Sequence, residues 1–306
     1  MLKPAVQTTV QDLGRRGSRH LGVGRCGAMD PAALMIGNAL VGNAVDAAAL
    51  ELCLPPASIR FDVECLMALS GAQCRARLDG AAIDTGRSVL AKAGAQLELS
   101  AAPDGARAYL CVAGGIDVPI VMGSRSTDLQ TGLGGFEGRI LRRGDVLRVL
   151  PPAGNARPTV CSAPYPAAGP IRVLAGPEFD EFEPQARTAF LQSSWRVTPQ
   201  SNRMGFRLAG PELRRSVRDE LKSHAVFPGL IQVPPGGAPI VLMADAHATG
   251  GYPRIATVIA ADQGRLAQVP PGGSVQFTLC TRAAALSAWQ KLLAFVHAMR
   301  SEPDAH

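Results

Sequence analysis

The segment GLIQVPPGGAPIVLMADAHATGGYP, residues 229–253, combines an apolar run, two turn signals and a polar cluster. Residues 234–237 (PPGG) predict a tight turn, because proline presets φ and glycine accepts positive φ. Residues 239–243 (PIVLM) are short, apolar and bounded by turns, which is typical of a buried β-strand. This stretch therefore predicts one buried strand between two turns.

Polar side chains alternate after this strand at Asp245, His247 and Thr249, and residues 250–253 (GGYP) follow them. A strand that ends in polar side chains and a glycine pair can bring the backbone close to a ligand. The same pattern also fits an ordinary hairpin end, in which Asp and Thr cap turns. Short motifs of this kind do not decide between the two interpretations.

The chain as a whole has 306 residues, of which 47% are hydrophobic and 18% are charged, so it can bury a sizeable core in one large or two ordinary domains. Its 33 glycines and 24 prolines favour many turns and short strands. Aromatic residues make up only 5%, which argues against base-stacking platforms for nucleic acid.

The net charge of +6 comes almost entirely from scattered arginine. Scattered arginine suits the recognition of carboxylate or phosphate groups, since its planar guanidinium binds two oxygens. A GC-rich genome would encode the same abundance of arginine without any functional purpose. Without a basic tract of five or more residues, we expect no nucleic-acid partner.

Seven cysteines occur without a Cys-x-x-Cys pair, which is typical of small buried side chains in a reducing compartment. The N-terminal residues contain no signal-peptide core, and no apolar run approaches membrane-spanning length. We therefore expect a cytoplasmic protein with no membrane partner.

Hydrophobic patterning divides the chain into two β-rich halves. In the first half, a strand within residues 4–12 precedes a helix that begins after Asp30 and ends near residue 42. Strands are predicted at residues 50–54, 59–61, 65–69, 73–78, 88–91, 96–99, 107–113 and 145–149 in that half, and at 171–174, 195–198, 206–208, 230–233, 239–243, 254–259 and 274–281 in the second.

Residues 151–170 contain six prolines and form the best linker candidate. The predicted domains are therefore residues 1–160 and 170–306. Two helices are expected in the second domain, one near residues 178–191 and an amphipathic one at residues 283–300.

Several familiar site types are excluded. Residues 22–27 match Gly-x-Gly-x-x-Gly by letter, but no buried strand precedes them and no βαβ unit follows, so a dinucleotide site is rejected. A P-loop motif is absent from the sequence, and the five histidines are dispersed, so we expect no metal site.

Three polar-dense stretches remain: residues 10–15, residues 123–127 with 134–139, and residues 201–208. Hydroxyls, glycine amides and arginines together suit an oxyanion or a phosphate. Surface loops held by Ser and Thr turns, or a pair of solvated arginines, remain open as alternatives.

Six motifs, taken in order, resemble one family: residues 10–15 (VQDLGR), 27–31 (GAMDP), 123–127 (GSRST), 201–208 (SNRMGFRL), 231–234 (IQVP) and 249–253 (TGGYP). This family is the C subunit of prokaryotic 5-oxoprolinase, also called allophanate hydrolase subunit 2 or the biotin-dependent carboxyltransferase family. The resemblance covers residues 5–282.

The resemblance implies a mainly β fold of two tandem cyclophilin-like β-barrels, a few short helices and a C-terminal amphipathic helix. It also implies a complex with a B subunit of related fold and with an A subunit. This complex opens the cyclic amide 5-oxo-L-proline to L-glutamate, so the chain would belong to an ATP-hydrolysing hydrolase. ATP, with or without Mg²⁺, would be bound by the complex rather than by this chain alone.

Two alternatives stay open. One is a carboxyltransferase module of a biotin-dependent urea or amide carboxylase, in which biotin is the cofactor. The other is a non-catalytic regulatory partner of a B subunit that resembles a kinase inhibitor.

The resemblance also implies site residues, in the matched motifs and in residues 245–248 just before the last of them. Three are assigned catalytic roles: Arg203, Asp245 and Tyr252. Substrate binding is assigned to Gln11, Asp12, Arg15, Ser124, Arg125, Thr127, Asn202, Arg207, Gln232, His247, Thr249, Gly250 and Gly251. The chain departs from the common family pattern at His224, His247 and Ala248, where two imidazoles appear and an acid is lost, which changes the proton chemistry available to the site.

Overall fold

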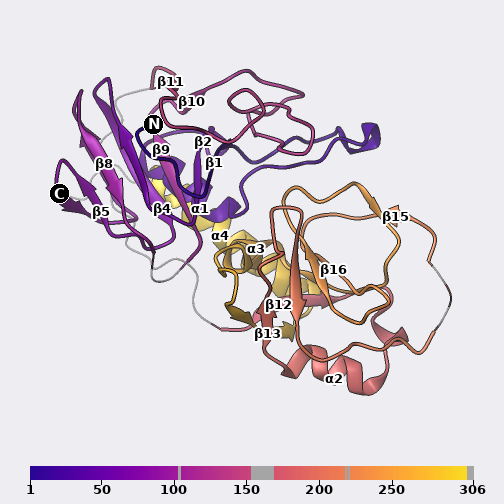
Figure 1. Cartoon of the computed structure of the whole chain (residues 1–306). Coiled ribbons are helices and arrows are strands. Elements are labelled where there is room, and N and C mark those ends of the chain that lie inside the picture. Colours follow the sequence, from indigo (N-terminus) through magenta and orange to yellow (C-terminus); the bar gives the residue numbers. More distant parts are fainter. Residues whose placement is uncertain (103–104, 153–168, 218, 220, 302–306) are drawn as a thin grey trace. The chain divides into compact units, whose positions relative to one another are not determined.

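The computed structural model describes residues 1–102, 105–152, 169–217, 219 and 221–301, and it is mainly β, with 31% strand and 18% helix. Figure 1 shows two groups of strands along the chain, one coloured indigo to magenta and the other orange. The predicted mainly β class is confirmed.

The strands of the first group are β1 (Gln7–Gln11), β2 (Ala49–Cys53), β3 (Ala57–Arg60), β4 (Cys65–Gly71), β5 (Ala76–Leu78), β6 (Ala81–Ile83), β7 (Ser88–Ala91), β8 (Gln96–Leu99), β9 (Arg107–Val112), β10 (Ile116–Asp117) and β11 (Arg148–Val149). Those of the second are β12 (Ile171–Ala175), β13 (Trp195–Val197), β14 (Gly205–Ala209), β15 (His224–Ala225), β16 (Leu230–Gln232), β17 (Ile240–Leu242), β18 (Thr249–Gly250), β19 (Arg254–Val258), β20 (Ser274–Val275) and β21 (Phe277–Leu279). The helices are η1 (Arg19–Leu21), α1 (Pro31–Leu40), η2 (Phe179–Glu181), α2 (Pro184–Gln192), α3 (Ala260–Ala267) and α4 (Arg282–Ser301).

Two compact units exchange short pieces of chain. Unit 1 consists of Met1–Arg16, Cys26–Pro166 and Leu292–His306, and unit 2 consists of Gly17–Arg25 and Ala167–Lys291. Each unit is described by itself below.

The described part of unit 1 contains three antiparallel sheets, and the two larger ones share a hydrophobic cluster. The strand orders are β1-β2-β9-β4-β7, β3-β8-β5-β6 and β10-β11. Leu52, Leu69, Leu97 and Leu110 belong to one hydrophobic cluster contributed by both sheets. Alternating burial along β5 and β8 explains why these strands were readable from sequence.

Helix α1 packs against β4 and β9 in unit 1. It begins as predicted, because the side chain of Asp30 accepts a hydrogen bond from the backbone N–H of Ala33 at 3.0 Å and Pro31 occupies the first helical position. Beside it, the carboxylate of Glu51 accepts hydrogen bonds from Tyr109 Oη (2.7 Å) and from the backbone N–H of Met29 (2.8 Å). Burial, with the neighbouring Glu51, raises the pKa of Tyr109 well above its ordinary value.

Unit 2 is built on an eight-stranded sheet in the order β20-β13-β14-β17-β16-β19-β12-β21. Its two edge strands, β20 and β21, are separated in sequence only by Gln276, so the sheet nearly closes into a barrel. Phe190 of α2 stacks on Phe277 with ring centroids 5.0 Å apart, and the buried indole of Trp195 donates to the carbonyl of Phe190 at 3.0 Å.

Helix α3 is anchored to β12 by a buried carboxylate. Asp262, which is fully buried, accepts from the backbone N–H of Arg172 at 2.8 Å and from its guanidinium at 2.9 and 2.6 Å. Burial alone would raise the pKa of the Asp262 carboxyl, but the hydrogen bonds from Arg172 outweigh it, so this pKa lies below its ordinary value.

Asp262→Asn is expected to lower the free energy of unfolding by about 2 kcal/mol at pH 7, because a charge-assisted bidentate contact is lost. The pKa of Asp262 is lower in the folded protein than in the unfolded chain, where it is about 4. The extra stability of the wild type over Asp262→Asn is therefore fully present above about pH 4, and it is lost as the pH falls through the folded-state pKa. Urea unfolding of both proteins at pH 7 and at pH 3.5 measures this difference. An advantage that is as large at pH 3.5 as at pH 7 would contradict the assignment.

The predicted helices are confirmed at α1 and α4, and the helix expected near residues 178–191 divides into η2 and α2 at Pro184. Helix α3 was not predicted. The linker prediction falls mostly on residues 153–168, which lie outside the described residues. Among the described residues, no helix combines the length and the hydropathy needed to cross a membrane.

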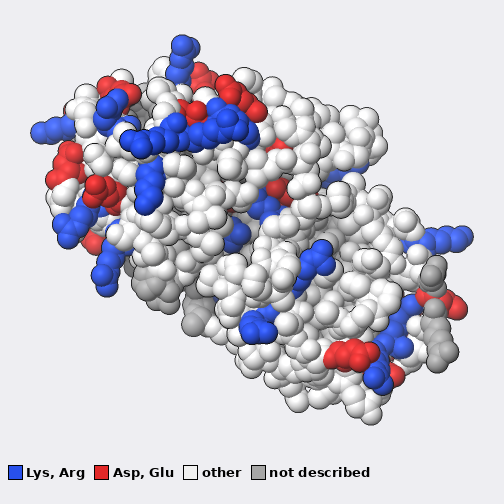
Figure 2. Space-filling view, in the orientation of Figure 1, with Lys and Arg blue, Asp and Glu red and all other residues white. Residues whose placement is uncertain are grey.

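Acidic and basic side chains are interspersed over the face shown in Figure 2. Elsewhere in the described chain, acidic and basic side chains also form close pairs, such as Arg60 with Asp62 (2.8 Å) and Arg139 with Asp145 (2.7 Å). The face shown therefore carries charges of both signs rather than one sign alone.

Candidate functional site

Six of the predicted site residues lie in unit 1, and Asp12 connects most of them. Its Oδ1 accepts from Ser124 Oγ at 2.7 Å and from Ser126 Oγ at 2.5 Å, and its Oδ2 accepts from the backbone N–H of Arg125 at 2.5 Å. The backbone N–H of Gly14 also donates to Oδ1, at 2.7 Å. Two motifs more than 100 residues apart in sequence thus meet on one carboxylate.

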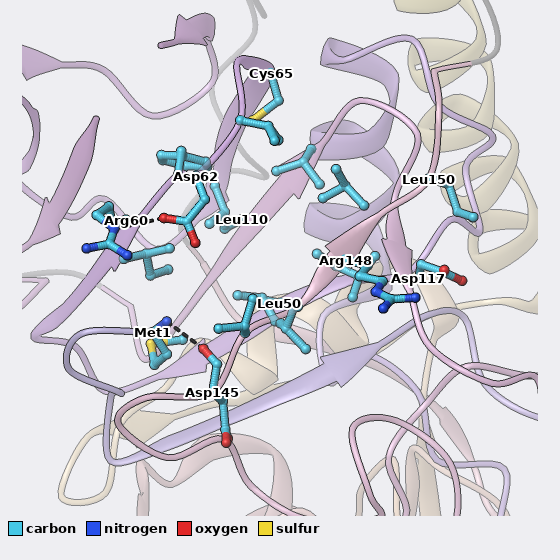
Figure 3. Close-up of a pocket in the computed structure, with 18 of the residues that line it drawn as sticks. Met1, Leu50, Arg60, Asp62, Cys65, Leu110, Asp117, Asp145, Arg148 and Leu150 are labelled. Carbon is cyan, nitrogen blue, oxygen red and sulfur yellow. Dashed lines mark hydrogen bonds and ion pairs between the residues drawn. The ribbon is translucent and has the colours of Figure 1, made fainter. Parts of the chain in front are cut away.

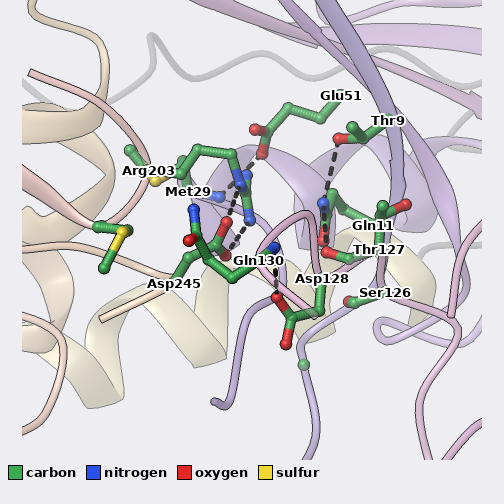
Figure 4. A network of polar contacts seen from close by, with 12 residues as sticks. Thr9, Gln11, Met29, Glu51, Ser126, Thr127, Asp128, Gln130, Arg203 and Asp245 are labelled. Atoms are coloured by element: carbon green, nitrogen blue, oxygen red, sulfur yellow. Dashed lines mark hydrogen bonds and ion pairs between the residues drawn. The ribbon is translucent and has the colours of Figure 1, made fainter. Parts of the chain in front are cut away.

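Gln11 and Thr127 extend this cluster (Figure 4). Gln11 is fully buried, and its Nε2 donates to Thr9 Oγ1 at 3.0 Å and to the carbonyl of Thr127 at 3.2 Å. Thr127 in turn donates to the carbonyl of Val10 through both its backbone N–H and its hydroxyl, each at 2.9 Å. The end of β1 is thereby fixed along the segment that carries the hydroxyls.

Arg15 belongs to the same cluster, with its Nη2 donating to the carbonyl of Ser126. Its side chain is 1% exposed. Arg125 instead directs its Nε to the carbonyl of Val118 at 3.0 Å, so its guanidinium holds a loop of the same unit.

Gly135 packs closely against Thr127 of the unit 1 cluster. A Cβ on Gly135, whose φ is +55°, would lie 1.9 Å from Thr127 Oγ1, whereas a Cβ on Gly132, whose φ is +69°, would meet nothing within 4 Å. Both glycines have φ in the left-handed region, so a side chain at either position would be strained. Only at Gly135 would a Cβ also collide with a neighbouring atom.

Gly135→Ala is expected to destabilise the protein by about 3 kcal/mol, because strain at positive φ adds to overpacking against Thr127. Gly132→Ala is the matched control, with an expected loss of about 1 kcal/mol from φ alone. Chemical denaturation of both variants tests the packing, and equal losses would show that Thr127 is not in contact.

Ten predicted site residues lie in unit 2, where Arg203 and Asp245 form a buried ion pair (Figure 4). The guanidinium Nε and Nη2 donate to the two carboxylate oxygens of Asp245, both at 2.8 Å, and the side chains are 4% and 2% exposed. The backbone N–H of Asp245 also donates to the carbonyl of Arg203 at 2.9 Å. The pair holds the start of β14 against the segment after β17.

The structure separates the two arginines of residues 201–208. Arg203 is buried before β14, whereas Arg207 lies within β14 with an exposed side chain. Asn202 forms the turn between them, with its Oδ1 accepting from the backbone N–H of Met204 at 2.8 Å. Burial therefore places these two arginines in different environments, one inside unit 2 and one on its surface.

Gln232 and the residues from Thr249 to Tyr252 form a second group. Gln232 Nε2 donates to the carbonyl of Tyr252 at 3.2 Å, and Thr249 and Gly250 pair with β15 as strand β18. Tyr252 is 46% exposed as a residue, so it can contact a ligand or a partner. Tyr252 and Gly251 line a cavity of about 750 Å³ whose other walls include Arg214 and Arg215.

His247 and Ala248, which depart from the family pattern, contribute backbone carbonyls. Arg19 Nη2 donates to the carbonyls of Val226, His247 (3.3 Å) and Ala248 (3.4 Å) within unit 2. Burial lowers the pKa of Arg19 below its ordinary value. The role of Arg19 was missed, because no sequence spacing signals a contact with carbonyls more than 200 residues away.

Glu178 and Arg254 are a second pair that sequence reasoning missed. Glu178 Oε2 accepts from the Arg254 backbone N–H at 2.9 Å and from its Nε at 2.8 Å. Burial alone would raise the pKa of Glu178, but the bonds from Arg254 outweigh it and the pKa is lowered. The pair fixes the strand that follows residues 249–253.

A further cavity of about 450 Å³ lies in unit 1 (Figure 3). Its walls are largely apolar, with Leu50 and Leu110 among them. The charged residues of the lining are Arg60, Asp62, Asp117, Asp145 and Arg148, and Arg60 pairs with Asp62 at 2.8 Å. The cavity therefore combines an apolar interior with charges of both signs.

Among the described residues, no group of three or more His, Cys, Asp or Glu side chains could hold a metal ion. Burial raises the pKa of the Cys65 and Cys74 thiols to about 11. These thiols are therefore poor nucleophiles at neutral pH.

Comparison with known proteins identifies the family to which this chain is similar. Residues 21–279 match the model of the carboxyltransferase domain, subdomain A and B. The chain is 48% identical over 294 residues to the C subunit of 5-oxoprolinase from Escherichia coli (strain K12), covering 95% of this chain and 94% of that protein. It is 40% identical to the C subunit of 5-oxoprolinase from Haemophilus influenzae, covering 89% of this chain and 87% of that protein.

The crystal structure of Kluyveromyces lactis urea carboxylase aligns with a TM-score of 0.90 at 30% identity. The alignment covers 99% of this chain but only 29% of that longer one. The fold described above is thus shared with one part of a larger protein.

Proposed function

The chain belongs to the carboxyltransferase-domain family, subdomains A and B, and from this premise we propose that it is one component of an ATP-dependent 5-oxoprolinase, which opens 5-oxo-L-proline to L-glutamate. One observation carries the proposal. The relatives named as the C subunit of 5-oxoprolinase match along nearly their whole length as well as along nearly the whole of this chain. The proposed partners are a B subunit of related fold and an A subunit, in the cytoplasm, with residues 1–160 and 170–306 as the two cyclophilin-like domains.

We assign the proposed catalytic roles according to how exposed each side chain is to solvent. Tyr252 is the member of the catalytic trio with an exposed side chain, so it is the group that contacts the lactam. Arg203 and Asp245 neutralise each other in a buried pair, and their part is to position the residues that precede Tyr252. Gln232, through its bond to the carbonyl of Tyr252, supports the same segment.

ATP fits the glycine-rich segment of unit 1 poorly. Phosphate cradles need backbone N–H groups that are open to the ligand. Here the N–H of Gly135 donates to the carbonyl of Arg125 at 3.2 Å, and that of Gly138 donates to the carbonyl of Gly134 at 2.8 Å. We therefore assign nucleotide binding, with any Mg²⁺, to the assembled complex rather than to this segment.

The test is reconstitution. The chain is co-expressed with its neighbouring gene products, and ADP release is measured with and without 5-oxo-L-proline. Lactam-dependent ADP release, with glutamate formed in equal amount, supports the proposal. A complex that assembles and never uses ATP would favour a regulatory partner instead.

Tyr252→Phe is expected to lower kcat of this complex by about 100-fold, the usual effect of removing a group that transfers or donates a proton. Phe227→Leu, at another exposed aromatic of unit 2, is the control and is expected to retain activity. An unchanged kcat in Tyr252→Phe would remove Tyr252 from the catalytic trio.

A biotin-dependent carboxyltransferase is the second candidate, favoured by the TM-score of 0.90 to urea carboxylase. It requires a biotinylated carrier protein, since residues 1–306 contain no Met-Lys-Met acceptor sequence. Bicarbonate- and biotin-dependent carboxylation of urea by the reconstituted complex, without lactam opening, would select it.

A further inference from the structure

The apolar cavity of about 450 Å³ in unit 1 lies among side chains of the core (Figure 3). Leu50 of β2, Ile59 of β3 and Leu110 of β9 line it, and all three belong to the hydrophobic cluster of that unit. Protein interiors are close-packed and contain few spaces larger than a water molecule. A space of this volume instead falls within the range of small-molecule sites.

The wall that carries β11 holds the cavity open, because backbone contacts fix it at both ends. Before β11, the backbone N–H of Gly144 donates to the carbonyl of Met1 at 2.9 Å. After β11, the N–H of Leu150 donates to the carbonyl of Gly115 at 3.0 Å, and a Cβ on Gly114 would lie 1.8 Å from the Leu150 oxygen. The wall cannot move inward without breaking these contacts, so the cavity is preformed.

Three of the charged groups around the cavity are already bonded to protein partners. Arg60 pairs with Asp62 at 2.8 Å, and Asp145 accepts from the guanidinium of Arg139 at 2.7 and 3.1 Å. These hydrogen bonds from Arg139 hold the pKa of Asp145 below its ordinary value. The amino group of Met1 donates to the carbonyl of Asp145 at 2.7 Å (Figure 3).

The two remaining charges in the lining have opposite signs and lie opposite each other. Asp117 of β10 and Arg148 of β11 are register partners in the antiparallel pair, and both are exposed. Opposite charges at such positions attract each other. Among the described lining residues, no charge of either sign is therefore left unopposed toward the interior.

The cavity also has an apolar mouth. Val63 and Val146 belong to its lining and are 56% and 68% exposed, so solvent reaches the cavity past two apolar side chains. Cys65 lines it as well, and burial raises the pKa of its thiol to about 11, so the thiol is uncharged at neutral pH.

We propose that this cavity binds a small, uncharged apolar molecule, such as an aromatic hydrocarbon of two fused rings. Contact with the apolar walls drives binding, because the polar groups of the lining already bond within the protein. A charged group on the ligand would lose its hydration without gaining a partner. 5-Oxo-L-proline carries a carboxylate and is therefore not this ligand, so the inference is independent of the proposed function.

The experiment measures the fluorescence of N-phenyl-1-naphthylamine, an uncharged probe that brightens in apolar surroundings, on the full chain alone and with its co-expressed partners. The competitors are 2-methylnaphthalene, 2-naphthoate, which replaces the methyl group by a carboxylate, and 5-oxo-L-proline. We expect 2-methylnaphthalene to displace the probe, 2-naphthoate to compete at least about 10-fold more weakly, and 5-oxo-L-proline not to compete.

Two matched variants locate the binding. Val149→Phe places a larger side chain in the lining, whereas Val89→Phe makes the same change at a half-buried valine of the same cluster outside the lining. Val149→Phe should weaken probe binding by about 10-fold or more and melt no lower than wild type, because its ring enters the cavity. Val89→Phe should bind the probe as wild type does.

The Cys65 thiol gives a second, local readout. At ten times its dissociation constant, 2-methylnaphthalene should slow the reaction of Cys65 with N-ethylmaleimide by about 10-fold, measured by mass spectrometry. The thiol of Cys74 also has a pKa of about 11 and lies outside the lining, so it controls for a general stabilisation of the fold.

Three results would each overturn the inference: a wild-type chain that binds no probe, displacement by 2-naphthoate as strong as by 2-methylnaphthalene, or full affinity in Val149→Phe. Equal slowing at Cys65 and Cys74 would also count against this cavity as the site. Loss of probe binding whenever the partners are present would assign the cavity to apolar side chains of a partner and reject a small-molecule ligand.

Discussion

Arg203→Met is expected to lower the free energy of unfolding by about 3–5 kcal/mol, the usual loss when one partner of a buried ion pair is removed. Arg203 supplies both side-chain hydrogen bonds to the carboxylate of Asp245, which is 2% exposed. The substitution therefore leaves a carboxylate buried without its cation. Chemical denaturation at pH 7 measures the effect.

The second substitution Asp245→Leu should recover part of that loss, because it removes the stranded charge. Arg207→Met, at an exposed arginine of the neighbouring strand, is the control and should change stability by less than about 0.5 kcal/mol. A double variant that is less stable than Arg203→Met would show that the buried charge is not the source of the loss.

Asp12→Ala is expected to destabilise unit 1 by about 3–4 kcal/mol. Four donors lose their acceptor at once, and two of them are backbone N–H groups that cannot turn toward water. Ser124→Ala removes one donor to Asp12 and also the acceptor of the buried Ser126 backbone N–H (3.0 Å), and it is expected to cost about 2 kcal/mol. Asp46→Ala, at an exposed aspartate, should be close to neutral.

Hydrogen exchange adds a spatial check on Asp12. If Asp12 connects the two motifs, its loss should deprotect amides in residues 124–127 as well as those beside it, since Ser124, Arg125 and Ser126 all bond to it. Loss of protection confined to residues 12–14 would contradict that connection.

Local chemistry made part of the fold predictable. The helix at α1 was signalled by Asp30 and Pro31, which cap it as expected. The strand at β17 was signalled by turns on both sides of an apolar run. In both cases the determining residues are neighbours in sequence.

Helix α3 shows where such signals end. Its eight residues include a glycine, and its apolar side chains are three alanines and Leu266, so little apolar bulk marks this short segment as a helix. Its N-terminal turn is held by Asp262, whose partner Arg172 lies 90 residues earlier. A contact at that separation has no local signature, so tertiary structure overrode local propensity.

The candidate site was likewise predictable only in part from the sequence. The family motifs identified Asp12, Arg203 and Asp245 as important, but the structure shows that they bond to protein groups, which spacing alone did not reveal. Burial also separates Arg203 from Arg207, although either helical or strand spacing allowed them to act together.

The exchange of short segments between the two units has a consequence for biosynthesis. Gly17–Arg25 is made early but belongs to unit 2, and Leu292–His306 is made after all of unit 2 but belongs to unit 1. A nascent chain that has emerged through the end of unit 1's main segment still lacks one part of that unit. Domains usually fold as units during translation, the N-terminal one first. The contacts of unit 1 with Leu292 and the residues after it can form only when all of unit 2 has been synthesised, so unit 1 is completed late.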